Sequence, residues 1–256
     1  MYKNQSAIPS RVCIIIPCYN EAARLKPHVF RDYLVAHAGV RFLFVDDGSG
    51  DGTVALVKEL CVGYEDRAEC LECKPNAGKA EAVRKGFLHA AQTHDLDAVG
   101  YWDADLATPL TAILEFNAVL SRQPNKEMVF GSRVKLLGRA VKRRVLRHYL
   151  GRVFATAASI TLRLPIYDTQ CGAKLFRVND DLKKVFAEPF ISKWVFDVEI
   201  VARYSEIHGH DAALMERCIY EYALDEWSDV AGSKVRPRDF FTAMLDLLRI
   251  NFRYFR

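Results

Sequence analysis

The chain has 256 residues, of which half are hydrophobic and 27% are charged, and its formal net charge is +4. This composition excludes a disordered chain and a small disulfide scaffold, and it suits one large domain with a sizeable core. Seven cysteines lie mostly in apolar runs, residues 1–11 are mainly polar and no apolar stretch reaches 18 residues, so we expect a reducing, cytosolic protein without a secretory signal or transmembrane span.

Apolar runs and helical patterns alternate through the first half of the chain. We expect strands at residues 12–16, 41–45, 69–74, 99–102 and 128–130. We expect helices at residues 21–37, 53–62, 79–93 and 109–121, followed by a basic amphipathic helix at 141–162. This alternation predicts an α/β fold whose mainly parallel central sheet is flanked by helices, with functional side chains at the carboxyl ends of the strands.

Two carboxylates, Asp103 and Asp105, come directly after the apolar run that begins at Val99. In a strand, residues two apart point to the same face, so both carboxylates can converge on one cation. Mg2+ or Mn2+ prefers such oxygen pairs, usually with phosphate as a further ligand. For an isolated Asp-x-Asp the simpler interpretation is a helix-capping turn before Pro109, and the rest of the chain argues against it.

Two glycine-containing turns flank predicted helix starts. The segment 46–53 holds three acids and three glycines, which lets the backbone approach a planar ligand while a carboxylate accepts hydrogen bonds from a base or ribose. A receiver domain also has paired acids after a strand, but this chain is too long for one and the Asp-x-Asp would have no role there. Gly78 and Lys79 stand where a diphosphate could bind, although a lone lysine is more often solvated.

Basic and amphipathic segments fill the second half. Residues 135–152 contain seven lysines and arginines and no acid, which indicates an anionic partner such as a phosphate or membrane surface, or else a solvated helix face. Residues 239–256 predict an amphipathic C-terminal helix with Arg249, Arg253 and Arg256 beside an apolar stripe of Phe240, Phe241, Met244, Leu245, Leu248 and Phe252. That stripe fits either an anionic bilayer surface or core packing.

The order of motifs resembles family 2 glycosyltransferases of the GT-A fold: residues 17–21 (PCYNE), 46–49 (DDGS), 76–79 (NAGK), 103–105 (DAD) and 131–133 (GSR). Residues 168–174 (DTQCGAK), 196–199 (FDVE) and 232–235 (GSKV) resemble the branch of dolichyl- and polyprenyl-phosphate sugar synthases. Residues 103–109 (DADLATP) are similar to the glucosyltransferase members. The resemblance covers residues 11–252.

The resemblance implies a metal-dependent, inverting transfer of a hexose, glucose from UDP-glucose, to a polyprenyl or dolichyl phosphate. Within a single domain of residues 1–256, residues 11–133 would bind the donor and residues 134–256 the acceptor. The donor nucleotide would be held by Pro17, Tyr19, Glu21, Asp47, Lys79 and Asp103, and Mg2+ or Mn2+ by Asp103 and Asp105. The catalytic set would be Asp103, Asp105, Arg133, Asp168 and Lys234, with Arg133, Lys234 and the basic run 139–152 placing the acceptor phosphate.

Three alternatives stay open. The same fold could use a sugar hydroxyl of a glycolipid or polysaccharide, it could use GDP-mannose as donor, or the chain could be an inactive nucleotide-sugar-binding protein. Ala107 stands where mannosyl-type members often carry Gln, which favours glucose and leaves a third side-chain contact to the metal in question. We expect peripheral contact with the cytoplasmic face of a membrane and no nucleic-acid partner.

Overall fold

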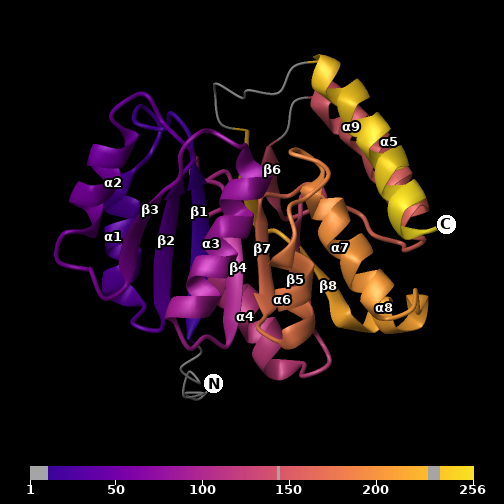
Figure 1. Cartoon of the computed structure of the whole chain (residues 1–256), viewed down its shortest axis with the longest axis horizontal. Coiled ribbons are helices and arrows are strands. Elements are labelled where there is room, and N and C mark those ends of the chain that lie inside the picture. Colours follow the sequence, from indigo (N-terminus) through magenta and orange to yellow (C-terminus); the bar gives the residue numbers. More distant parts are fainter. Residues whose placement is uncertain (1–10, 143–144, 230–236) are drawn as a thin grey trace.

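A seven-stranded sheet, with strands in the order β3-β2-β1-β4-β7-β5-β8, runs through the protein (Figure 1). The computed structural model describes residues 11–142, 145–229 and 237–256. The strands of the sheet are β1 (Val12–Cys18), β2 (Val40–Asp46), β3 (Ala68–Glu72), β4 (Ala98–Trp102), β5 (Met128–Ser132), β7 (Ala173–Arg177) and β8 (Ile219–Ala223). Two short parallel strands, β6 (Ala140–Lys142) and β9 (Glu226–Ser228), form a second sheet.

Helices cover both faces of the large sheet. They are α1 (Pro27–Ala36), α2 (Thr53–Cys61), α3 (Lys79–Thr93), α4 (Ala112–Arg122), α5 (Val145–Leu162), α6 (Asp180–Ala187), α7 (Phe196–Ile207), α8 (Ala212–Cys218) and α9 (Pro237–Tyr254). Alternation along β1 explains the two layers: Val12, Ile14 and Ile16 pack with α1, α2 and α4, whereas Cys13 and Ile15 pack with α3, α6 and α7. The predicted α/β fold is confirmed.

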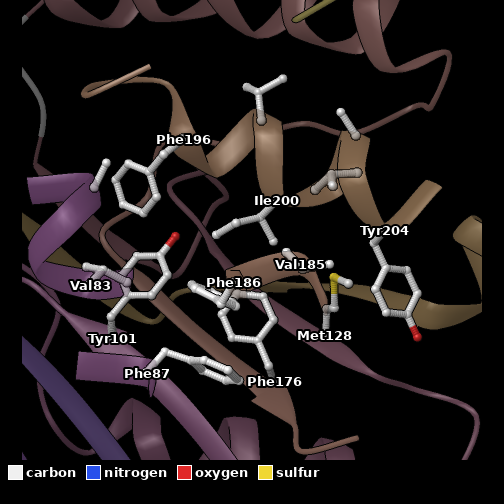
Figure 2. Close-up of a cluster of buried hydrophobic side chains, with 14 of the residues drawn as sticks. Val83, Phe87, Tyr101, Met128, Phe176, Val185, Phe186, Phe196, Ile200 and Tyr204 are labelled. Atoms are coloured by element: carbon white, nitrogen blue, oxygen red, sulfur yellow. The ribbon is translucent and has the colours of Figure 1, made fainter. Parts of the chain in front are cut away.

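The core on the α3, α6 and α7 face is rich in aromatic rings. Figure 2 shows Tyr101 of β4 among Val83, Phe87 and Phe196. The rings of Phe87 and Phe186 stack with their centroids 4.2 Å apart. Such large buried apolar surfaces supply most of the favourable free energy of folding, and they fix the helices that carry the polar groups described below.

One strand runs against the others. β1 is parallel to β2 and β4, β2 is parallel to β3, and β5 is parallel to β8, so the prediction of a mainly parallel sheet is confirmed. β7 is antiparallel to both neighbours, β4 and β5. It therefore begins beside the carboxyl end of β4, and this brings residues 163–172 to the edge where Asp103 lies.

Three predicted helix starts were wrong. The helix expected from Glu21 begins at Pro27, because proline lacks the N–H that a helix interior needs but fits the first turn. The basic helix expected from Val141 begins at Val145, since Val141 instead pairs with Trp227 between β6 and β9. The helix expected from Pro109 begins at Ala112. The other predicted elements agree with the structure to within two residues at each end.

α5 and α9 lie side by side at the edge of the molecule away from α1 and α2 (Figure 1). The predicted C-terminal helix is confirmed, but its predicted stripe divides between two environments. Phe240 and Met244 are half-buried against the core, whereas Phe241, Leu245, Leu248 and Phe252 are exposed. The buried face of α9 is formed by Leu247, Ile250 and Tyr254.

Candidate active site

The acidic side chains predicted to be functional gather at the carboxyl ends of β1, β2 and β4. Because these three strands are parallel neighbours, their ends meet at one edge of the sheet. Pro17 lies in β1, Tyr19 and Glu21 follow it, Asp47 follows β2, and Asp103 and Asp105 follow β4. Glu21 and Asp47 are buried and Tyr19 is 41% exposed, so the edge offers both anchored acids and an accessible ring.

Asp103 and Asp105 lie in a turn rather than in a strand. β4 ends at Trp102, and the amide of Leu106 donates to the carbonyl of Asp103 across the turn. The alternation of side chains along a strand, which predicted that the two carboxylates share a face, therefore does not apply to them. The Asp105 Oδ1 accepts from the Ala107 amide at 3.1 Å, but α4 begins only at Ala112, so the pair does not cap that helix.

The electrostatics of this pair suit a divalent cation. Burial, and next the charge of Asp103, raises the pKa of Asp105, because the Ala107 amide and the charges of Arg24 and Lys79 offset these two effects only in part. Lys79 Nζ lies 2.5 Å from Asp103 Oδ1, and its charge also acts on Asp105. Among the described residues no cluster of three or more possible metal-ligating side chains exists, so Mg2+ or Mn2+ would need other ligands, which a diphosphate provides. The residues present fit such an ion.

Asp46 and Asp47 play different roles. Both carboxylate oxygens of Asp47 accept backbone hydrogen bonds, from the Ala77 amide at 2.9 Å and the Gly78 amide at 2.7 Å, so this residue fixes the approach to α3. Asp46 Oδ2 accepts from two amides of its own turn, whereas the buried Oδ1 has no hydrogen-bond partner among the described residues. An acceptor without a donor is where a nucleobase N–H would be stabilising. The sequence-based choice was Asp47 alone.

Arg133 and Asp168, both predicted to be catalytic, form a buried bidentate pair. Arg133 Nε and Nη2 each lie 2.7 Å from a different oxygen of Asp168, and the guanidinium also lies over the Trp227 ring. Glu221 accepts from the amides of Tyr167 and Asp168 and so fixes this corner. The charge of Arg133 is therefore compensated within the protein. Lys234, Arg143 and Arg144 lie outside the described residues.

The Arg133–Asp168 pair predicts a pH dependence. Burial alone would raise the pKa of Asp168, but the charge and hydrogen bonds of Arg133 outweigh it and hold that pKa below its usual value. The stabilisation is therefore present above the unfolded-state pKa of about 3.9 and is lost as the pH falls through the lower folded-state pKa. The free energy of unfolding, measured in urea from pH 7 to pH 2, should fall less steeply at acidic pH in Asp168→Asn, because about one proton fewer is taken up on unfolding. The same acidic decrease in the variant and the wild type would contradict this assignment.

Sequence reasoning missed three features that support the acid pair. Gly172 packs directly on Asp103, whose amide donates to the Gly172 carbonyl at 3.0 Å. Fully buried Lys174 places its Nζ 2.5 Å from Asp197 Oδ1 and 2.6 Å from the Cys171 carbonyl, and the Tyr101 hydroxyl donates to the same Asp197 oxygen. Gly172 and Lys174 lie in the motif 168–174 and Asp197 lies in the motif 196–199. The spacing of these motifs along the sequence does not show that the residues are in contact.

Lys193 is the third missed feature. Its aliphatic stem packs on Gly78, whose φ of +98° suits glycine, immediately before α3. Its loop is fixed by Ser192, which donates to Asp246 of α9 at 2.7 Å and accepts from the amides of Trp194 and Val195. Among the described residues its ammonium has no hydrogen-bond or ion-pair partner. The stem of a second lysine therefore lies beside Gly78, the residue before Lys79, whereas the sequence predicted one lysine at this helix start.

Solved structures share this fold, a mostly parallel sheet flanked by helices. Glucosyl-3-phosphoglycerate synthase from Mycobacterium tuberculosis, in complex with Mn2+, UDP and glucosyl-3-phosphoglycerate, is similar with a TM-score of 0.65 at 17% identity. The similarity covers 98% of this chain and 87% of that one. A second structure of this synthase gives a TM-score of 0.64 at 16% identity, over 96% and 80% of the two chains.

The chain belongs to glycosyl transferase family 2, whose model matches residues 13–183. The dolichyl-phosphate beta-glucosyltransferase of Dictyostelium discoideum is 30% identical over 256 aligned residues, which cover 94% of this chain and 74% of that protein. The protein of the same name from Homo sapiens is 28% identical, covering 95% and 76%. The predicted family and its glucosyltransferase branch are thus confirmed.

Proposed function

We propose that this glycosyltransferase moves glucose from UDP-glucose to a dolichyl or other polyprenyl phosphate, with inversion at the anomeric carbon. The observation that carries the proposal is the acid pair Asp103 and Asp105 beside Lys79, in a chain whose curated relatives are dolichyl-phosphate beta-glucosyltransferases. Residues 11–133 would bind the donor and residues 134–256 the acceptor.

The donor would lie across the carboxyl edge of β1, β2 and β4. Asp103 and Asp105 would hold Mg2+ or Mn2+ with the donor diphosphate, and the bound ion would stabilise negative charge on the leaving group. The N-terminus of α3 and the ammonium of Lys79 present positive charge to the same diphosphate. Attraction to Asp103, followed by Asp197, outweighs burial and raises the pKa of Lys79, so its ammonium stays protonated at neutral pH.

The acceptor chemistry explains why the site needs cations more than a general base. A sugar hydroxyl must lose a proton as it attacks, whereas a lipid phosphate is already ionised near neutral pH. Attack by the lipid phosphate on the anomeric carbon, from the face opposite the leaving diphosphate, would convert an α-linked donor into a β-linked product. Asp168 compensates the charge of Arg133. We therefore propose that Arg133 holds residues 167–170 in place and does not bind the acceptor phosphate.

The edge formed by α5 and α9 suits contact with a membrane surface. α9 exposes Phe241, Leu245, Leu248 and Phe252 at spacings of one helical face, and α5 exposes Tyr149, Val153 and Ile160 in the same way. Exposed apolar side chains beside arginines fit the interface of an anionic leaflet. In the described ranges, no helix is both long and apolar enough to cross a bilayer. From the exposed apolar faces of α5 and α9 we propose peripheral contact with the cytoplasmic face of a membrane.

The membrane assignment predicts a specific loss on mutation. The double variant Phe241→Glu, Leu248→Glu should lower binding to phosphatidylcholine vesicles containing about a quarter phosphatidylserine by tenfold or more. It replaces two exposed apolar side chains that the bilayer would bury, and burial of each contributes about 1.5–3 kcal/mol. Vesicle co-sedimentation measures this. Val35→Glu, an equally exposed site on α1, serves as the control. Equal binding of the double variant and wild type would refute the assignment.

The function is tested by incubating the protein with radiolabelled UDP-glucose, Mn2+ and dolichyl phosphate. We expect label in a β-linked lipid product, with no product from Asp105→Ala. Parallel reactions with GDP-mannose and with glycolipid or polysaccharide acceptors distinguish the alternatives. Transfer to a saccharide only, or from GDP-mannose only, would overturn the proposal, and so would full activity of Asp105→Ala.

A further inference from the structure

A cavity of about 250 Å3 lies between α5 and the segment that follows it. One wall comes from α5 and the other from residues 165–167, and the lining is mostly apolar or uncharged: Ala155, Thr156, Ser159, Ile160, Pro165, Ile166 and Tyr167, with Arg152 as its one charged member. Ile160 is 73% exposed, so the cavity opens onto the exposed apolar face of α5. The cavity is thus a groove that extends from the exposed face of α5, at Ile160, to the buried side chains of Ala155 and Ile166.

Arg152 gives the groove a positive end. Its guanidinium stacks on Tyr167, 3.9 Å from the ring centroid, which keeps the planar group in place. Nη1 is buried and has no hydrogen-bond partner within the described part of the chain. Burying a charged donor without an acceptor is unfavourable, so a bound anion would be stabilised here.

The groove also lies beside the corner that holds Arg133. Tyr167 directly precedes Asp168, and the amides of both are held by Glu221. Asp168 compensates the charge of Arg133, whereas none of the described carboxylates forms an ion pair with Arg152. Among the described residues of this corner, the positive charge without a paired carboxylate is therefore on Arg152, at the end of the groove formed by Tyr167.

We propose that this groove binds the acceptor lipid, with the phosphate facing Arg152 and the first isoprene units along Ala155, Ile160 and Ile166. The inference rests on the proposed function. An anionic head next to an apolar chain matches the one charged group and the uncharged lining that holds Ala155, Ile160 and Ile166. The opening at Ile160 lets the rest of the chain continue along the exposed face of α5. The groove thus selects an isoprenyl phosphate over a water-soluble phosphate.

The test measures binding of farnesyl phosphate to the whole protein by calorimetry, without donor or turnover. Thr156→Trp fills the groove from an exposed position and should weaken binding at least tenfold. Val35→Trp, at an exposed position on α1 and outside the groove lining, should bind as wild type does. Arg152→Met keeps the side-chain stem, removes the charge and should abolish the preference for farnesyl phosphate over farnesol.

The outcomes separate this inference from the proposed function. Unchanged farnesyl phosphate binding in Thr156→Trp, or a preference for the phosphate that persists in Arg152→Met, would overturn the groove assignment even if dolichyl phosphate is glucosylated. Wild-type protein that fails to bind farnesyl phosphate would overturn it as well. Groove-dependent binding without transfer from UDP-glucose would uphold the groove and refute the proposed reaction. Each variant should also bind UDP with Mn2+ as wild type does, which shows that it is folded.

Discussion

Gly172→Ala is expected to lower glucosyl transfer by roughly 100-fold while the protein remains folded. A Cβ at this position would lie 1.9 Å from Asp103 Oδ2 and 2.3 Å from its Cγ, so the carboxylate must move. Asp103 would then lose its place beside Lys79 and Asp105, and displacement of a reacting group by about 1 Å is enough for a loss of this size. Initial rates, together with calorimetric binding of UDP and Mn2+, measure the effect.

Gly63→Ala provides the matched control for Gly172→Ala. Gly63 has a φ of +83° but open space around it, in the turn after α2. Alanine there should cost about 1 kcal/mol of stability through backbone strain and leave the rate of transfer unchanged. If Gly172→Ala retained wild-type activity, the tight packing of residue 172 on Asp103 would have no functional consequence.

Lys174→Met should destabilise the fold by about 3–5 kcal/mol. The variant removes the buried ammonium and, among the described residues, leaves the Tyr101 hydroxyl as the remaining side-chain donor to Asp197 Oδ1. An uncompensated buried charge is far costlier than the loss of one hydrogen bond. Urea unfolding at neutral pH measures the change as a shift in midpoint at constant slope.

A triple variant distinguishes charge from packing at the same position. Lys174→Met, Asp197→Leu and Tyr101→Phe together replace the whole polar cluster by apolar side chains of similar size, so most of the lost stability should return. Transfer activity should stay low, because Lys174 also anchors the Cys171 carbonyl next to Gly172. If the triple variant were no more stable than Lys174→Met, the uncompensated charge would not be the cause.

The location of the acid pair was predictable for a general reason. Apolar runs that alternate with helical patterns produce parallel strands, and their carboxyl ends meet at one edge, so Asp103, Asp105 and Asp47 had to lie near each other. The sequence did not predict that Asp103 and Asp105 occupy a turn. β4 ends where its pairing with β7 ends, at Trp102 opposite Ala173, and that partner is distant in sequence.

The surface of α9 shows the limit of a periodic pattern. A 3.6-residue repeat identifies an apolar stripe but not what covers it. Contacts with α5 and α7 bury Leu247 and Ile250, and they leave Phe241, Leu245 and Leu248 exposed. Which apolar residues became core was decided by the neighbouring helices.

By itself the sequence determined the fold class, the family and the edge of the sheet at which the site lies, because these depend on local periodicity and on short motifs. Only the tertiary structure decided how the charges are paired. The antiparallel entry of β7 brings Gly172 onto Asp103, places Lys174 against Asp197 and joins Asp168 to Arg133. Ion pairing depends on distances of a few ångströms between residues far apart along the chain, and such distances are set only when the whole sheet is assembled.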